Sequence, residues 1–151
     1  MSKELSKQNT KNYELPSTNL LEPLDKTLSH QSHKDEIKQQ CQIIEKTLAD
    51  FRTNGKVIGV TRGPSVTRFV LVPAPGVKVR SFVNLADDIA LRLAVPDVRV
   101  EAPIPGKAAI GIDVPNISSD IVTFRELVEC EDVRKNPSRL CVGLGKDVEG
   151  N

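Results

Sequence analysis

Residues 55–116 read GKVIGVTRGPSVTRFVLVPAPGVKVRSFVNLADDIALRLAVPDVRVEAPIPGKAAIGIDVPN, and this stretch decides the fold. It contains three turn signals, Gly63-Pro64, Pro75-Gly76 and Pro105-Gly106. Runs rich in β-branched residues lie on both sides of the first signal and of the third, and such runs predict antiparallel strand pairs. An amphipathic segment between the two pairs predicts a helix. The stretch therefore indicates a hairpin, a helix and a second hairpin.

The pattern also gives the expected bounds of these elements. Strands are predicted at 56–61 and 66–72, a helix from between Ser81 and Asn84 up to Pro96, and strands at 97–101 and 108–114. In the last strand the apolar side chains alternate with small or polar ones, which is typical of a strand that is buried on one face only. Those apolar side chains are Ile110, Ile112 and Val114.

Further elements are expected on both sides of this stretch. A helix should begin near His33, with Ser32 as its cap and Asp35 completing a capping box, and it should end at Asn54-Gly55, with Gly55 in the left-handed position. Downstream, a short helix is predicted at 123–131 and a last strand at 140–144. The fold class is α+β, with the order ββ-α-ββ-α-β after an N-terminal helix, and antiparallel strands form a sheet with helices packed on one face.

Residues 1–31 are polar and show no amphipathic period, so we expect a disordered or extended arm there and the folded domain at 32–151. One apolar island, from Leu15 to Leu24, interrupts the arm, and its two prolines exclude a regular helix. On the residues alone, a linker with an apolar spot is favoured over an arm that docks on a neighbouring surface.

Composition narrows the possible functions. The formal net charge of +1 argues neither for nor against a nucleic-acid partner. With no Trp, one Tyr and four Phe, a surface that stacks bases on aromatic rings is not expected. Cys41, Cys130 and Cys141 have no metal-site spacing and are expected to be reduced thiols. No apolar run is long enough for a bilayer, so the expected location is cytoplasmic, without membrane contact by this chain.

The sequence contains no catalytic motif of the kinds considered below. A phosphate-binding loop needs G-x-x-x-x-G-K-[ST], and the chain has three Gly-Lys pairs, at Gly55, Gly106 and Gly145. In all three, both the upstream glycine and the following hydroxyl residue are replaced. No nucleophile elbow or zinc-ligand spacing is present either. We therefore expect no catalytic, cofactor-binding or metal residue in this chain.

Basic residues at the turns are the remaining candidates for a binding site. If the loops converge at one end of the sheet, these residues would form a positive patch that meets phosphates. The alternative is that they only keep the loops soluble, and the residues alone favour this slightly. The five candidates are Arg62, Arg68, Lys78, Arg80 and Lys107.

Several segments resemble the α domain that precedes the ATPase core in FtsK/SpoIIIE-type DNA translocases. The resemblance covers about residues 13–151 and keeps the order of several rare turn dipeptides. The matching segments are YELPSTNLLEP, GKVIGVTRGPSVTRFVLVPAPGVKV, NLADDIALRLAV, VRVEAPIPGKAAIGIDVPN and NPSRLCVGLGKDVEG.

The resemblance implies a part of a ring-shaped motor, usually a hexamer, through which double-stranded DNA passes. In that family a separate β domain binds ATP and Mg²⁺, while the α domain braces the ring and lines part of the channel. Residues 144–151 would then begin the connection to the β domain, and no cofactor is expected in this chain. The implied role is chromosome segregation at cell division or sporulation.

The resemblance also favours an intersubunit docking arm that includes Leu15, Leu20 and Leu21. Two alternatives stay open. One is a stand-alone DNA-binding or regulatory module without the motor, and the other is a small-molecule enzyme, for which the residues offer no acid, base or nucleophile.

Overall fold

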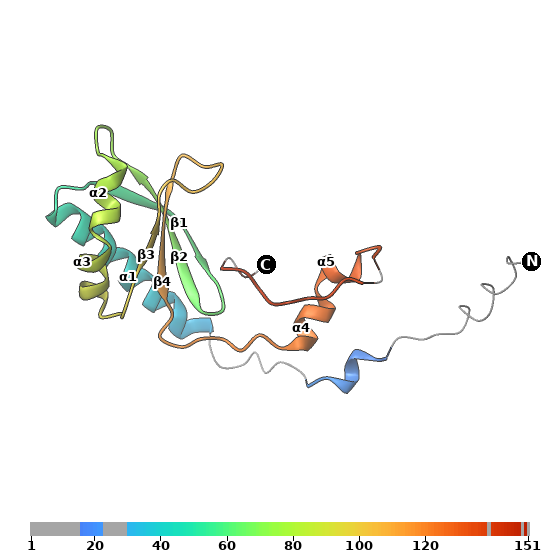
Figure 1. Cartoon of the computed structure of the whole chain (residues 1–151). Helices are drawn as coiled ribbons and strands as arrows, with labels where there is room; N and C mark the ends of the chain where they lie inside the picture. Colours follow the sequence, from blue (N-terminus) through green and yellow to red (C-terminus); the bar gives the residue numbers. More distant parts are fainter. Residues whose placement is uncertain (1–15, 23–29, 139, 149, 151) are drawn as a thin grey trace, which may run out of the picture. The chain divides into compact units, whose positions relative to one another are not determined.

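The computed structural model describes residues 16–22, 30–138, 140–148 and 150 (Figure 1). The chain divides into two compact units. The larger comprises residues 25–122 and 144–151, and the smaller comprises residues 1–24 and 123–143.

The larger unit is built on a four-stranded antiparallel sheet. Its strands are β1 (Gly55–Arg62), β2 (Val66–Pro73), β3 (Arg99–Glu101) and β4 (Ile110–Pro115), in the order β1-β2-β4-β3. Both predicted hairpins form, and they join because β2 pairs with β4, from Val66 opposite Pro115 to Leu71 opposite Ile110. The α+β class is therefore confirmed.

Three helices pack on this sheet: α1 (His30–Asp50), α2 (Val79–Asn84) and α3 (Ala86–Leu93) (Figure 1). The register places Phe69 and Leu71 of β2 on the same face as Ile110, Ile112 and Val114 of β4. These five side chains form one buried cluster with helix residues, among them Ile44, Leu48, Phe82 and Ile89. Burial of this apolar face holds the helices to the sheet.

The ends of α1 differ from the prediction. The helix begins at His30, so Ser32 lies inside it and is not its cap. It ends at Asp50, and the left-handed position after it belongs to Arg52, with φ 55°. Gly55 instead begins β1, where an added Cβ would lie 2.9 Å from Cε1 of the buried Phe82 ring. The glycine serves close packing at this position and not a helix cap.

Two further expectations for the sheet and its second helix were wrong. β4 is buried on both faces, because Arg68 and Ile104 lie against the side of Gly111 that was expected to be open. The helix expected up to Pro96 is two helices, α2 and α3, which meet at the non-helical Leu85. The second of them already ends at Leu93, because the next residue, Ala94, is left-handed with φ 55°.

The smaller unit contains a 3-10 helix, η1 (Thr18–Leu20), and the short helices α4 (Phe124–Glu129) and α5 (Glu131–Arg134). Thr123 caps α4, since its hydroxyl accepts a hydrogen bond from the Glu126 N–H. The predicted helix at 123–131 is thus present as α4. The strand expected at 140–144 is not present, because those of its residues that the structure describes pair with no other strand, and Leu140, Val142 and Leu144 are exposed.

Candidate nucleic-acid interface

The sheet register separates the candidate basic residues into two groups. Arg62 pairs with Thr67 beside the β1–β2 turn, whereas β2 ends at Pro73 at the opposite end of the sheet. The eight residues of β2 span roughly 23 Å, at about 3.3 Å per residue. Lys78 and Lys107 belong to the connections at that opposite end, and Arg80 lies in the first turn of α2, directly after the first of these connections. The single converging patch considered from the sequence therefore does not form.

Exposed cations gather at the opposite end of the sheet, which we call the basic end. Lys78 precedes α2 in an extended conformation, and Arg80 lies in the first turn of α2. Lys107 follows Gly106, whose φ of 75° turns the β3–β4 connection. Lys56 is the second residue of β1 and lies opposite Val72. The sequence analysis did not include it, because only the register brings it to this end. All four residues of the basic end are exposed.

Arg68 has a different role from the one expected. Its guanidinium donates to both carboxylate oxygens of Asp113, with N–O distances of 2.7 and 2.8 Å, and it lies 3.0 Å from Glu101 Oε2. The Arg68 side chain is only 11% exposed. A buried guanidinium that already has two carboxylate partners is a poor contact for phosphate. Arg68 is therefore an ion-pair residue of the sheet and not a candidate DNA contact.

Arg62 also holds the fold together. Its Nη2 donates to the Ser118 carbonyl at 3.0 Å, and its Nε lies 3.9 Å from an Asp120 carboxylate oxygen. The side chain is 14% exposed, so little of it faces solvent. These contacts tie the end of β1 to the segment that follows β4.

The basic end suits contact with a phosphate backbone. Exposed ammonium and guanidinium groups bind phosphates through charge, and contacts to phosphate carry no sequence information. No group of three His, Cys, Asp or Glu side chains is placed to hold a metal within the described residues. In the same part of the chain, no helix is both long enough and apolar enough to cross a bilayer.

The predicted arm packs within the smaller unit. Arg125 Nη1 donates to the Leu21 carbonyl at 3.2 Å, and its Nε donates to Glu129 at 3.0 Å. Hydrogen bonds from Arg125 and then from Thr18 lower the pKa of the Glu129 carboxyl. Leu20 remains 79% exposed, and Leu15 lies outside the described residues. Whether the arm also reaches a second subunit stays a prediction.

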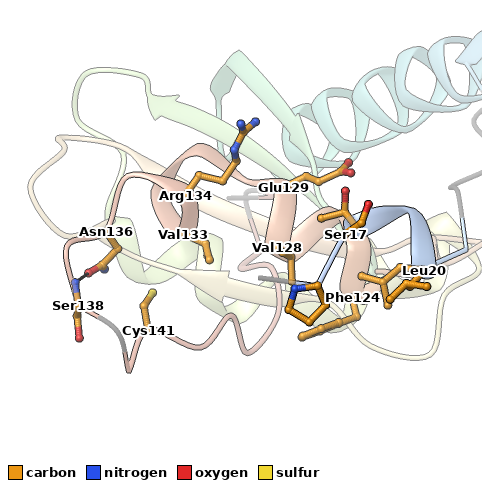
Figure 2. A pocket seen from close by; sticks show the side chains of 13 residues that line it. Ser17, Leu20, Phe124, Val128, Glu129, Val133, Arg134, Asn136, Ser138 and Cys141 are labelled. Atoms are coloured by element: carbon orange, nitrogen blue, oxygen red, sulfur yellow. Dashed lines mark hydrogen bonds between the residues drawn. The ribbon is translucent and has the colours of Figure 1, made fainter. Parts of the chain in front are cut away.

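A shallow groove lies beside η1 in this unit (Figure 2). Its lining is partly apolar, with Leu20, Phe124, Val128 and Val133, and the charged side chains of Glu129 and Arg134 lie along one side. Because these four apolar side chains line it, the groove offers a surface for apolar contact.

The family model of the FtsK alpha domain matches residues 15–116 of this chain. The chain belongs to the FtsK alpha domain family. A DNA translocase FtsK of Clostridium tetani is 44% identical across the whole chain, which spans 21% of that protein. A DNA translocase FtsK of Caldanaerobacter subterraneus is 51% identical over 75% of the chain, which aligns with 16% of that protein.

The DNA translocase SftA of Bacillus subtilis is 48% identical over 76% of the chain and 12% of its own length. The chain thus spans about one fifth or less of these relatives. Its α-domain fold and its relation to DNA translocases follow from these matches, and the resemblance inferred from the turn dipeptides is confirmed.

Proposed function

We propose that this α domain is a non-catalytic, ring-forming module of an ATP-driven double-stranded DNA translocase that acts in chromosome segregation. The observation that carries the proposal is the match of the whole chain, at 44% identity, to a protein named as a DNA translocase. ATP and Mg²⁺ are bound by other parts of the translocase, since none of the three Gly-Lys pairs has the residues of a phosphate-binding loop.

The basic end is the part of this module that meets DNA. Lys78, Arg80 and Lys107 are exposed, and the register places them at one end of the sheet. Contacts of this kind hold a duplex without reading its sequence, which suits a motor that moves along any DNA. The module works in the cytoplasm, within a ring that is a hexamer in the assembled translocase.

The contacts between subunits are proposed to include the arm. Leu20 is largely exposed on η1, and the groove beside it has further apolar lining. Apolar side chains that stay exposed in one copy are candidates for burial against a neighbouring copy.

A second candidate function is a DNA-binding or regulatory module that acts without a motor. The exposed cations of the basic end favour it, because they are present whether or not a ring forms. This candidate predicts that the isolated chain binds duplex DNA tightly and that binding weakens steeply with salt.

ATP hydrolysis by the purified chain, with and without duplex DNA, tests the non-catalytic role. We expect no hydrolysis above the buffer rate at any protein concentration. Hydrolysis that rises in proportion to the concentration of the chain would overturn the proposal. Sedimentation of the chain with and without DNA then separates the two candidates, because only the ring-forming module assembles into larger species when the chain concentration rises.

A further inference from the structure

The β1–β2 turn of the larger unit is fixed by the segment that follows β4. The side-chain amide of Asn116 donates to the Gly63 carbonyl at 2.9 Å and to the Pro64 carbonyl at 3.3 Å. Its Oδ1 accepts from the Thr67 hydroxyl at 2.7 Å, and its backbone N–H donates to the Ser65 carbonyl at 2.9 Å. Asn116 therefore makes the turn a rigid surface.

A second segment lies on this turn. We call residues 146–148 together with Gly150 the strap. The carbonyl carbon of Val148 lies 3.0 Å from the position of a Cβ added to Gly63, and its oxygen lies closer still. Gly150 donates to the Asp147 carbonyl at 3.0 Å, and a Cβ on Gly150 would lie 3.8 Å from the Arg62 carbonyl oxygen. The strap thus packs backbone to backbone against the turn.

Two of the three connections between the units, those at residues 122–123 and 143–144, therefore begin or end near the same turn. The chain leaves the sheet through residues 116–122, where Asp120 donates its N–H to the Pro64 carbonyl at 2.8 Å. After residues 123–143 it returns, and the strap contacts Gly63. The β1–β2 turn thus contacts the chain both before and after residues 123–143.

We propose that the strap is a releasable latch on Gly63, which fixes the direction of the chain after residue 144 when it is docked. The strap can lie against Gly63 because this residue has no side chain. The Cβ of any larger residue would push the Val148 carbonyl away. Val148 has the only apolar side chain among the strap residues and keeps 38% of its surface exposed, so the strap buries little apolar area and belongs to the parts of a fold that open at low cost. Its use in a motor rests on the proposed function, since a docked strap transmits movement and a released one does not.

Gly63→Ala tests this contact directly. Gly63 is not among the glycines with positive φ, so its backbone accepts alanine. The matched control is Gly59→Ala in β1, where an added Cβ meets only Val70 Cβ at 4.0 Å. We expect the ¹H–¹⁵N heteronuclear NOEs of Lys146, Asp147, Val148 and Gly150 to match those of the sheet in the unaltered chain and in the control. In Gly63→Ala they should fall to values typical of a free tail, with tryptic cleavage after Lys146 several-fold faster.

An added Cβ on Gly63 also lies 3.2 Å from the Val66 carbonyl oxygen, so Gly63→Ala crowds the β1–β2 turn as well as the strap. A second experiment separates these two effects. In a chain that ends at Leu144, Gly63→Ala should lower the urea midpoint less than it does in the full chain. Equal losses in both backgrounds would overturn the proposal, and so would tail-like NOEs for the strap in the unaltered chain. The test uses neither ATP nor DNA, so its failure leaves the proposed function standing.

Discussion

Arg68 of β2 and Asp113 of β4 form a two-pronged ion pair on the sheet face opposite the helices, with N–O distances of 2.7 and 2.8 Å. Glu101 of β3 lies against the same guanidinium at 3.0 Å. Three neighbouring strands are thereby joined by charge as well as by their backbone ladder. The pair explains why a charged residue is buried in the middle of β2 and why both faces of β4 are covered.

Asp113→Ala should destabilise the larger unit by about 3 kcal/mol, since it takes away the two-pronged carboxylate partner of the buried Arg68 charge. Urea unfolding followed by far-ultraviolet circular dichroism measures the free energy of unfolding. Lys135→Ala is the control, because the Lys135–Glu131 pair is exposed on both sides. The double variant Arg68→Met/Asp113→Leu should recover most of the loss. A single variant within about 0.5 kcal/mol of the unaltered chain would contradict this role.

Gly55→Ala should cost about 1–3 kcal/mol of unfolding free energy, because the new methyl group would overlap the buried ring of Phe82. The same unfolding measurement checks it, with Gly59→Ala as a control that meets no close neighbour. In a Phe82→Leu background the added cost of Gly55→Ala should shrink to less than half. A cost that is unchanged in that background would show that the ring is not the cause.

Replacing Lys78, Arg80 and Lys107 with alanine should weaken duplex binding and make the salt dependence shallower, by about one unit of slope for each phosphate that is no longer neutralised. Fluorescence anisotropy at a series of salt concentrations measures both quantities. The matched control removes three exposed lysines of α1, Lys34, Lys38 and Lys46. Equal effects of the two triple variants would mean that net charge, and not the basic end, determines binding.

Arg125→Ala should release the arm from α4, because it removes the donor to both the Leu21 carbonyl and Glu129. Amide exchange of residues 17–22 should then become faster, whereas Lys135→Ala should leave it unchanged. The pKa of Glu129 is lowered in the folded state, so the ionised carboxylate contributes to stability above its ordinary pKa of about 4.3. This stabilisation is lost as the pH falls through the folded-state pKa. Arm exchange that stays slow in Arg125→Ala would refute this account.

Two of the thiols, those of Cys130 and Cys41, should react with iodoacetamide in a defined order. Cys130 is exposed, whereas Cys41 is partly buried against the core, and burial followed by the nearby Glu45 charge raises the pKa of the Cys41 thiol. Since the thiolate is the reactive form, Cys130 should be alkylated before Cys41 at neutral pH. Mass spectrometry of peptides over time checks the order. Faster labelling of Cys41 would contradict the packing of α1 on the sheet.

The sequence predicted the elements whose signals are local. The Gly63-Pro64 turn and the flanking β-branched runs marked β1 and β2 to within one residue. The stripe of Ile44 and Leu48 marked the buried face of α1. These features depend only on periodicity and turn chemistry, which a single chain displays.

What the sequence missed depends on interactions between distant residues. Pairing of β2 with β4 separates Arg62 from Lys107 and buries Arg68, and no local pattern reports which hairpins become neighbours. The sequence around Gly55 predicted a helix C-cap, whereas in the structure Gly55 packs closely against the ring of Phe82. The strand expected at 140–144 has the right alternation, but a strand also needs a partner, and none of the described strands pairs with it.

The most direct test of the central claim is a chimera in which this chain replaces the corresponding segment of the Clostridium tetani FtsK, with which it shares 44% identity. The measurement is ATP-dependent displacement of a triplex-forming strand from duplex DNA by the purified chimera. We expect displacement at a rate near that of the parent, and slower displacement when Lys78, Arg80 and Lys107 are replaced by alanine. A chimera that hydrolyses ATP and assembles, yet displaces no strand, would contradict it.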